Sequence, residues 1–207
     1  MNHELVIGKY TLESLTNGMY ASPLDLYREY IQNAADSIDT AIAEKLERPE
    51  CFEIAIHLDH EKNMLSIFDN GHGLSKKEAI STLIDIGNSN KHRTQNRGFR
   101  GIGRLAGLGY CDELIFITSF SGESTKTLVH YNAKLLRELL LTSSEDSISV
   151  NDVMNQIVFV EEFDEKPNRH YFEVKMLGVM RNNGLMDEDL VRNYLIQHSP
   201  LPFRKGF

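Results

Sequence analysis

The sequence lacks several features that mark particular classes of protein. It has two cysteines in 207 residues, Cys51 and Cys111, in no metal-ligand spacing and too few for a disulfide framework. No stretch approaches the ~20 apolar residues that a membrane span needs. Residues 1–10 also lack the apolar core of a signal peptide. These absences exclude a disulfide-stapled secreted domain and a membrane-spanning one, so we expect a cytoplasmic protein with no membrane partner.

Positive charge is also in short supply. Lysine and arginine number 22 against 30 aspartates and glutamates, which gives a formal net charge of -8. This excess of negative charge argues against a domain whose main function is to bind nucleic acid. Hydrophobic residues make up 41% of the chain and charged residues 25%, which are the proportions of a folded globular protein.

Hydrophobic patterning predicts a protein in which helices and strands are interleaved. The longest helical pattern runs from residue 22 to about 45, with Ser22 at the N-cap position and Pro23 at the first helical position. Alternating apolar residues predict strands, and further helical patterns lie between them. No strict βαβ rhythm appears, so we expect an α+β fold. The predicted strands are 52–58, 65–68, 114–120, 126–131, 157–163 and 171–176, and the other helices are 75–84, 133–141 and 187–197.

We expect one principal domain over residues 1–180. Residues 181–207 would then form a C-terminal helix and the start of a linker. The last residues, 199–207, contain no closing element, so we expect the chain to continue into downstream domains that hold part of the function.

The first polar cluster consists of Glu29, Asn33 and Asp36, whose spacing puts them on one face of the long helix. Taken alone, the pattern also fits an ordinary solvated helix face. In a functional interpretation, a carboxylate polarises an attacking water, an amide oxygen is a ligand for Mg²⁺, and a second carboxylate orients the water around the metal.

Two glycine-rich segments follow. Residues 69–73, Asp-Asn-Gly-His-Gly, come directly after a predicted strand and can bend closely around a flat ligand, although an ordinary turn uses the same residues. Residues 98–103, Gly-Phe-Arg-Gly-Ile-Gly, can offer backbone N–H groups to phosphate oxygens at the start of a helix. The second segment is neither a Rossmann fingerprint nor a Walker loop, because it lacks both the βαβ unit and a following Gly-Lys-Ser/Thr.

In this order, residues 29–36, 69–74 and 98–103 resemble the N box, the adenine box and the glycine-rich lid box of the GHKL ATPases. That superfamily includes gyrase B, the ninety-kilodalton heat-shock chaperones, histidine kinases, MutL and the MORC proteins. The resemblance covers roughly residues 10–177. It implies the Bergerat fold, a two-layer α/β sandwich whose mixed sheet carries helices on one face.

The resemblance also implies roles for individual residues. Glu29 would be the catalytic base, Asn33 the Mg²⁺ ligand, and Asp69 the acceptor for the adenine amino group. The backbone from Gly101 to Arg104 would cradle the phosphates. A solvated loop charge remains the alternative for the cations at positions 91 and 104. The nucleotide-binding residues implied in this way are Asn33, Asp36, Asp69, Gly71, Gly73, Leu74, Lys91, Arg100, Gly101, Ile102, Gly103 and Arg104.

Two details narrow the resemblance. Histidine kinases have a basic residue three positions after the N-box asparagine and no glutamate four positions before it, whereas this chain has Asp36 and Glu29. The hydrolytic branch of heat-shock chaperones, MutL and MORC proteins is therefore favoured. The Gly-Thr pair that precedes the last core strand in many members is absent, and His170 and Tyr171 stand there instead. One hydroxyl contact to the adenine pocket should therefore differ.

The function implied by the resemblance is Mg-ATP binding followed by slow hydrolysis to ADP and phosphate. Closure of residues 87–100 as a lid would promote an ATP-dependent homodimer and so switch downstream domains of the same chain. Two alternatives stay open. One is a nucleotide-gated binding or sensor module without turnover, and the other is a relative of the fold that binds no nucleotide.

Overall fold

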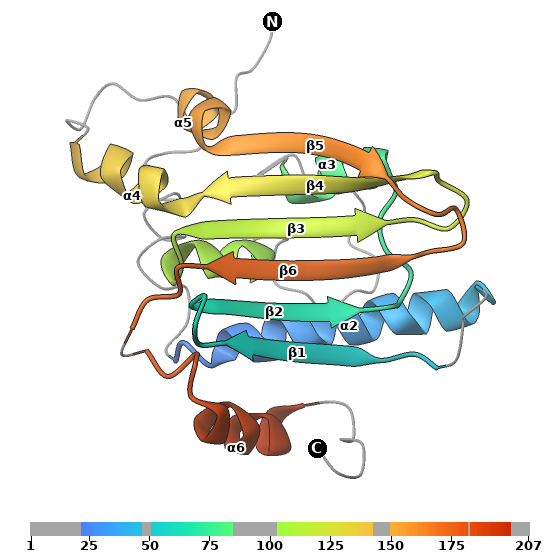
Figure 1. The fold of residues 1–207 in the computed structure, drawn as a ribbon, viewed down its shortest axis with the longest axis horizontal. Coiled ribbons are helices and arrows are strands. Elements are labelled where there is room, and N and C mark those ends of the chain that lie inside the picture. Colours follow the sequence, from blue (N-terminus) through green and yellow to red (C-terminus); the bar gives the residue numbers. More distant parts are fainter. Residues whose placement is uncertain (1–21, 47–50, 85–102, 143–149, 182, 200–207) are drawn as a thin grey trace, which may run out of the picture.

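The computed structural model describes residues 22–46, 51–84, 103–142, 150–181 and 183–199. Its centre is one six-stranded sheet in the order β1-β2-β6-β3-β4-β5 (Figure 1). The last of the described strands, β6, thus lies between two hairpins, β1–β2 and β3–β4. The strands are β1 (Ile54–Asp59), β2 (Met64–Asp69), β3 (Glu113–Ser119), β4 (Thr125–Asn132), β5 (Val158–Asp164) and β6 (Tyr171–Leu177).

The predicted α+β class is confirmed, but the expectation of a mixed sheet is wrong. All five pairings between the described strands are antiparallel. The connection after β4 shows why. Tyr131, near the end of β4, pairs with Val158 at the start of β5. The intervening segment therefore returns the chain to the end that it left, and β5 must run back along β4.

Helices cover one face of the sheet, as expected. Figure 1 shows α2 behind β1 and β2 and α3 behind the upper strands, while α4 and α5 lie beside the β4–β5 part of the sheet and α6 lies below β1. The described helices are α2 (Asp25–Ala43), α3 (Lys76–Leu83), the 3₁₀ helix η1 (Gly103–Gly109), α4 (Ala133–Thr142), α5 (Val150–Ile157) and α6 (Glu188–His198).

The amphipathic pattern of α2 is confirmed, but its predicted start is wrong. The helix begins at Asp25 and its N-cap is Leu24, which makes no side-chain cap. Ser22 instead accepts a hydrogen bond through its backbone carbonyl from the Asp25 N–H at 3.0 Å, so residues 22–25 form a separate turn. By contrast, the capping box that Ser75 and Glu78 predict for α3 is present with both hydrogen bonds.

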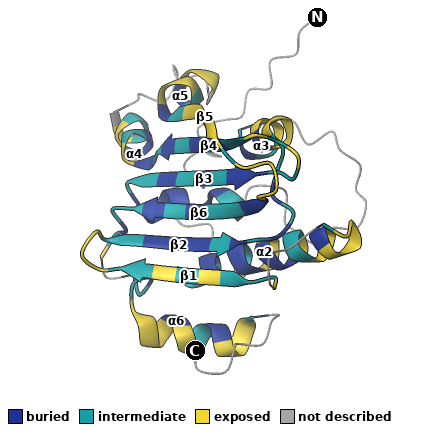
Figure 2. Ribbon diagram, turned by 45° about the vertical axis from the view of Figure 1, so that its right-hand side comes forward, coloured by how far each residue is buried: buried dark blue, intermediate teal, exposed yellow. Residues whose placement is uncertain are grey.

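The core lies between the sheet and α2. Tyr27, Leu65, Leu114 and Phe116 are each at most 1% exposed. Figure 2 shows this burial concentrated in the central strands, whereas β1 is intermediate to exposed and the outer side of α6 is largely exposed. Because α2 packs against this rigid layer, its polar face is held in a fixed position beside the sheet.

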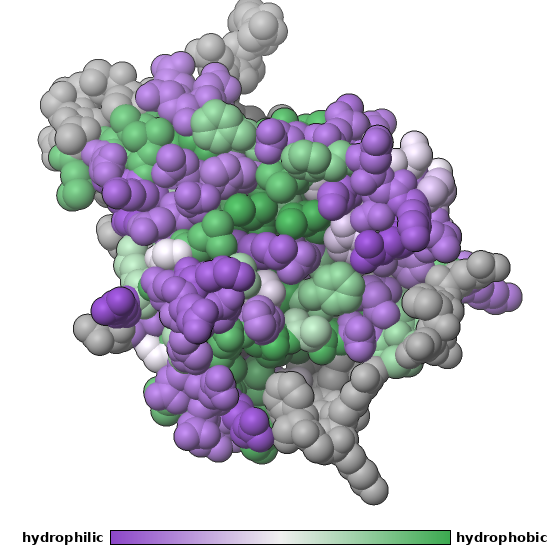
Figure 3. All heavy atoms as spheres, viewed as in Figure 1, coloured by the Kyte–Doolittle hydropathy of each residue, from purple (hydrophilic) through white to green (hydrophobic). Residues whose placement is uncertain are grey.

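The opposite sheet face has no described helix in front of it (Figure 1). Figure 3 shows hydrophobic side chains there interspersed with hydrophilic ones. Phe159 and Phe163 of β5 are 51% and 45% exposed, and Lys175 and Glu173 of β6 form an ion pair at 3.2 Å. Within the described residues, no helix is long and apolar enough to cross a membrane.

Candidate functional site

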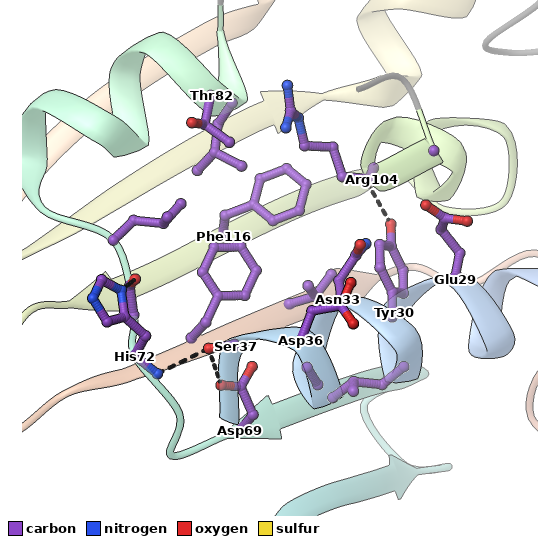
Figure 4. Close-up of a pocket in the computed structure, with 18 of the residues that line it drawn as sticks. Glu29, Tyr30, Asn33, Asp36, Ser37, Asp69, His72, Thr82, Arg104 and Phe116 are labelled. Atoms are coloured by element: carbon purple, nitrogen blue, oxygen red, sulfur yellow. Dashed lines mark hydrogen bonds between the residues drawn. The ribbon is translucent and has the colours of Figure 1, made fainter. Parts of the chain in front are cut away.

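A cavity of about 380 Å³ opens between α2 and the helix-covered face of the sheet. Figure 4 shows Asp69, Ser37 and His72 at one end, Glu29 at the other, and Phe116 between them. The cavity is therefore elongated, with different chemistry at its two ends. Its lining residues are Glu29, Tyr30, Asn33, Ala34, Asp36, Ser37, Thr40, Ile67, Asp69, His72, Gly73, Leu74, Thr82, Leu83, Gly103, Arg104, Phe116, Phe172 and Val174.

The three polar residues of the first cluster line this cavity from a single face of α2, as their spacing predicts. Glu29 is half-buried, whereas Asn33 and Asp36 are exposed. The Oδ1 atom of Asp36 accepts a hydrogen bond from Gln32 Nε2 at 2.9 Å. Carboxylate and amide oxygens thus face an open cavity, which is the donor chemistry that Mg²⁺ takes when waters and phosphates complete its shell.

The glycine-rich segment meets α2 at the Glu29 end. A Cβ atom built on Gly103 would lie 2.3 Å from Glu29 Oε1, so the Glu29 carboxylate would have to move to make room for a larger residue. The next residue of α2, Tyr30, secures the contact. Its hydroxyl donates to the Arg104 carbonyl at 2.8 Å and accepts from the Gly107 N–H at 3.2 Å. Gly103 and Arg104 are thereby fixed beside the carboxylate.

The other end of the cavity is centred on Asp69, the last residue of β2. Its side chain is buried, and Oδ1 accepts hydrogen bonds from Ser37 Oγ at 2.9 Å and from the Gly71 N–H at 3.0 Å. Burial raises the pKa of the Asp69 carboxyl to about 7, against the lowering effect of these two hydrogen bonds and of nearby His170. Asp69 is thus a hydrogen-bond acceptor at the base of the cavity, and burial disfavours its ionised form.

The turn after β2 follows α2 closely. A Cβ on Gly71 would lie 2.7 Å from the Ile38 backbone nitrogen, and a Cβ on Gly73 would lie 2.0 Å from the Ser119 carbonyl oxygen. Gly73 also has a φ of +69°, which side chains rarely adopt. Both glycines are therefore required by close backbone approach. Gly73 lines the cavity, whereas Gly71 is not among the lining residues.

His170 clamps the same turn from β6's side of the sheet. It is 6% exposed, and its Nδ1 contacts the Gly71 carbonyl in a short hydrogen bond that the imidazole must donate. Thr118 of β3 supplies a hydroxyl nearby, but this hydroxyl accepts from the Leu74 N–H at 2.8 Å and donates to the Tyr171 carbonyl at 3.0 Å. Of residues 170–172, only Phe172 lines the cavity. The different hydroxyl contact expected from the missing Gly-Thr pair stays a prediction.

Sequence reasoning missed several residues of the site. Phe116 and Phe172 form the apolar wall with ring centroids 5.9 Å apart, together with Ile67 and Val174. They come from neighbouring strands, and only the sheet register brings them together. Ser37 was also missed, although it lies four residues after Asn33 and so on the same helical face.

Arg104 lies on the far wall of the cavity. Figure 4 shows its side chain extending past Phe116 toward Thr82, away from Glu29. Its Nε atom is buried without a hydrogen-bond partner among the described residues, and burial lowers the pKa of the guanidinium. The other predicted lid residues, Lys91, Arg100, Gly101 and Ile102, lie outside the described residues.

The described residues contain no group of three or more His, Cys, Asp or Glu side chains that could cage a metal ion. Asn33 and Asp36 do offer oxygen atoms at the cavity, and Mg²⁺ is usually held by one or two protein oxygens together with substrate phosphates and water. The cavity as a whole joins a buried acceptor and apolar walls at one end to a carboxylate, an amide and a glycine-rich backbone at the other. It is therefore suited to a flat, amino-bearing ring joined to an anionic chain.

Comparison with known proteins agrees with this chemistry. A family model described as histidine kinase-, DNA gyrase B- and HSP90-like ATPase matches residues 26–158, more than half of the chain. The match includes every described residue of the cavity except Phe172 and Val174.

Individual relatives are chaperones. The chaperone protein HtpG of Acinetobacter baylyi is 37% identical over 84 residues, which are 38% of this chain and 13% of that protein. HtpG of Yersinia enterocolitica is 33% identical over 87 residues, which are 39% of this chain and 14% of that protein. HtpG of Vibrio cholerae is 30% identical over 87 residues. The matched segment thus spans about one seventh of the length of these relatives.

Proposed function

Because the chain belongs to the family of histidine kinase-, DNA gyrase B- and HSP90-like ATPases, we propose that Mg-ATP binds in the cavity between α2 and the sheet and is hydrolysed there. Family membership and the likeness to HtpG support ATP binding and hydrolysis in general. The observation that carries the specific assignment is the order of chemistry along the cavity, with Asp69 at one end and Glu29 against Gly103 at the other.

The base of the nucleotide lies at the Asp69 end. The Asp69 carboxylate accepts a hydrogen bond from the amino group of adenine, while Ser37 and the Gly71 N–H hold the carboxylate in position. Phe116 and Phe172 contact the ring, because an apolar wall removes its faces from water. Gly73 and Leu74 close the edge of the pocket, where a larger residue in place of glycine would collide with Ser119.

The phosphates lie at the Glu29 end. Backbone N–H groups of the glycine-rich segment, including Gly103 and Arg104, face the phosphate oxygens. Asn33 would hold Mg²⁺ through its amide oxygen, and Asp36 would orient the water around the ion. The ion would supply positive charge to the phosphate chain. Glu29 polarises a water and takes its proton as the oxygen attacks the γ-phosphorus. The bond to the bridging oxygen breaks, and ADP and phosphate leave.

We further propose that nucleotide binding acts as a switch. ATP would close residues 87–100 over the cavity as a lid and promote association of two copies of the domain, and hydrolysis would reverse both changes. Turnover by the domain alone should be slow, because stabilising the γ-phosphate in the transition state needs further positive charge, which other domains of a longer chain could supply.

Glu29→Gln tests the hydrolytic step. The variant keeps the size of the side chain and removes the base, so phosphate release should fall at least a hundredfold while the Kd for Mg-ATP stays within a factor of about two. Glu61→Gln, an exposed substitution in the β1–β2 turn, is the matched control and should release phosphate at the wild-type rate.

Two results would count against this assignment. Unchanged turnover in Glu29→Gln would remove Glu29 from the base role. A wild-type domain that binds Mg-ATP and releases no phosphate even at dimer-forming concentrations would favour the nucleotide-gated binding module.

Trapping the ATP state tests the switch. Glu29→Gln with Mg-ATP should sediment as a dimer, and the same protein with Mg-ADP as a monomer. Identical sedimentation in both nucleotides would contradict ATP-dependent association and leave the hydrolytic site unaffected.

A further inference from the structure

Arg104 carries a charge that the described protein does not compensate. It is the one lysine or arginine among the described residues lining the cavity, where Glu29, Asp36 and Asp69 supply acidic groups. No ion pair joins it to any of these three carboxylates within the described residues, and its Nε atom is enclosed without an acceptor. The guanidinium is therefore positioned by something other than pairing within the described site.

Arg137 is a useful comparison, because its guanidinium makes hydrogen bonds that connect elements of the fold. Its Nη1 donates to the carbonyls of Leu108 and Cys111 at 3.2 and 2.7 Å, and its Nη2 pairs with Asp112 at 2.8 Å. The contacts of Arg137 tie η1 to α4 and the start of β3. The Arg104 side chain makes no comparable set of contacts among the described residues.

Tyr131 does not supply the acceptor that Arg104 lacks. The Tyr131 hydroxyl lies close enough to Arg104 to affect its electrostatics, but the hydroxyl donates to the Leu83 carbonyl. A partly buried cation that lacks acceptors is costly, because it gives up water without receiving hydrogen bonds in return. Such a group is usually kept where a ligand supplies the missing anion.

The position of Arg104 identifies that anion. Its backbone follows Gly103, which touches Glu29 at the end of the cavity opposite Asp69. Its side chain then runs past Phe116 toward Thr82, on the side of the cavity opposite Asn33 and Asp36 of α2 (Figure 4). A chain of phosphates between these two walls would have oxygen ligands for Mg²⁺ on one side and a guanidinium on the other.

We propose that the Arg104 side chain is a phosphate-binding group that makes the cavity select nucleoside di- and triphosphates over nucleosides. This inference rests on the proposed nucleotide site and adds to it a side-chain contact beyond the backbone cradle. The planar guanidinium donates to phosphate oxygens from the wall opposite Asn33, and its charge is compensated only when the phosphates are bound.

Arg104→Met tests the proposal, because methionine keeps an unbranched apolar stem and removes the charge. Calorimetric titrations in Mg²⁺ should show ATP and ADP binding weakened about ten- to hundredfold, with adenosine affinity unchanged. Without ligand, the Tm of the variant should rise by about 2–4 °C, since an uncompensated charge has been removed. Arg104→Lys, which keeps the charge without the fork, should give an intermediate loss for ATP.

Arg137→Met is the matched control. It removes a guanidinium that is fully engaged, so its Tm should fall while the ratio of ATP to adenosine affinity stays at the wild-type value. The two substitutions should therefore change the Tm in opposite directions. If Arg104 had a purely structural role, Arg104→Met would lower the Tm and leave the ratio of ATP to adenosine affinity unchanged, as Arg137→Met does.

The outcomes separate this inference from the function on which it rests. Wild-type protein that binds ATP, together with an Arg104→Met variant that binds ATP equally well or loses adenosine to the same extent, would overturn the role of Arg104 alone. Wild-type protein that binds neither ATP nor adenosine would overturn the nucleotide site and this inference together.

Discussion

At the scale of single residues, the site depends on where side chains are absent as much as on where they are present. Gly71, Gly73 and Gly103 each allow a backbone or carboxylate to approach within a distance that a Cβ would block. These contacts hold the Asp69 turn against α2 and the glycine-rich segment against Glu29. The polar groups of the site are thereby positioned by backbone packing.

Gly73→Ala should be strongly destabilising. The added Cβ would lie 2.0 Å from the Ser119 carbonyl oxygen, and the residue has a φ of +69°, so we expect a loss of more than about 2 kcal/mol in urea unfolding and loss of ATP binding. Gly122→Ala is the control. Its φ is +91°, but nothing lies within 4 Å of the added atom, so only the backbone penalty of about 1–2 kcal/mol should remain. Equal losses at the two positions would contradict the close-contact explanation.

The raised pKa of Asp69 predicts a pH dependence of base binding. Burial gives the Asp69 carboxyl of the ligand-free protein a pKa of about 7, against an ordinary value of 3.8. Between these two pH values the folded state holds a proton that the unfolded state has released. Stability should therefore fall as pH rises through this window. Because an ionised carboxylate is the stronger acceptor, adenosine affinity should rise from about pH 6 to about pH 8.

Two variants identify the titrating group, and adenosine is the right probe because it carries no phosphate. Asp69→Asn should bind adenosine more weakly and without this pH dependence. His170 also faces Asp69, and His170→Asn keeps an N–H donor while removing the imidazole. It should retain the pH dependence, whereas a flat profile in His170→Asn would transfer the effect from Asp69 to His170.

The site residues that could be predicted from the sequence are those whose positions follow from local spacing along one helix or strand. Glu29, Asn33 and Asp36 recur on one helical face, and Asp69 ends a recognisable strand, so their approach to one cavity could be anticipated. Phe172 could not be. It reaches the cavity because β6 inserts between β2 and β3, a long-range pairing that no local pattern encodes.

At the scale of elements, α2 organises the site because it contacts both glycine-rich segments. Ser37, in the C-terminal half of α2, accepts a hydrogen bond from the His72 N–H at 3.0 Å. Tyr30, in the N-terminal half, donates a hydrogen bond to the Arg104 carbonyl in η1. A movement of either segment relative to α2 would separate the base end from the phosphate end.

Tyr30→Phe tests the contact between α2 and η1. The loss of a hydroxyl that bridges the Arg104 carbonyl and the Gly107 N–H should cost about 1–3 kcal/mol of stability and weaken ATP binding. In Tyr194→Phe, which removes a hydroxyl bonded to Asp25 at 2.6 Å outside the cavity, denaturation should show a comparable loss and calorimetry an unchanged ATP affinity. A variant of Tyr30 that loses stability but not affinity would show that η1 does not need this anchor.

Element prediction succeeded where end signals were explicit. The capping box of α3 and the Asp187 cap of α6 both occur as side-chain hydrogen bonds. It failed at α5 (Val150–Ile157), because this helix continues directly into β5 with no glycine or proline to mark its end. The start of α2 was misplaced because the Ser-Pro pair that resembles a helix start forms a preceding turn.

At the scale of the whole molecule, the α+β class and the family were both predicted from sequence and are confirmed, the latter by the match over residues 26–158. The expected mixed sheet was wrong, because β5 and β6 also pair antiparallel with their described neighbours. The proposed boundary between residues 180 and 181 stays a prediction, and α6 contacts α2 through the Tyr194 hydroxyl, which donates to Asp25 at 2.6 Å.

The account depends on one claim, that the cavity beside α2 binds Mg-ATP, and unfolding of the protein with and without the nucleotide tests it most directly. At about 100 times its Kd, Mg-ATP should raise the free energy of unfolding of the wild-type chain by about 2.7 kcal/mol, and Asp69→Asn should lose most of this gain. Unfolding of the wild-type chain that is unchanged at millimolar Mg-ATP would contradict the account.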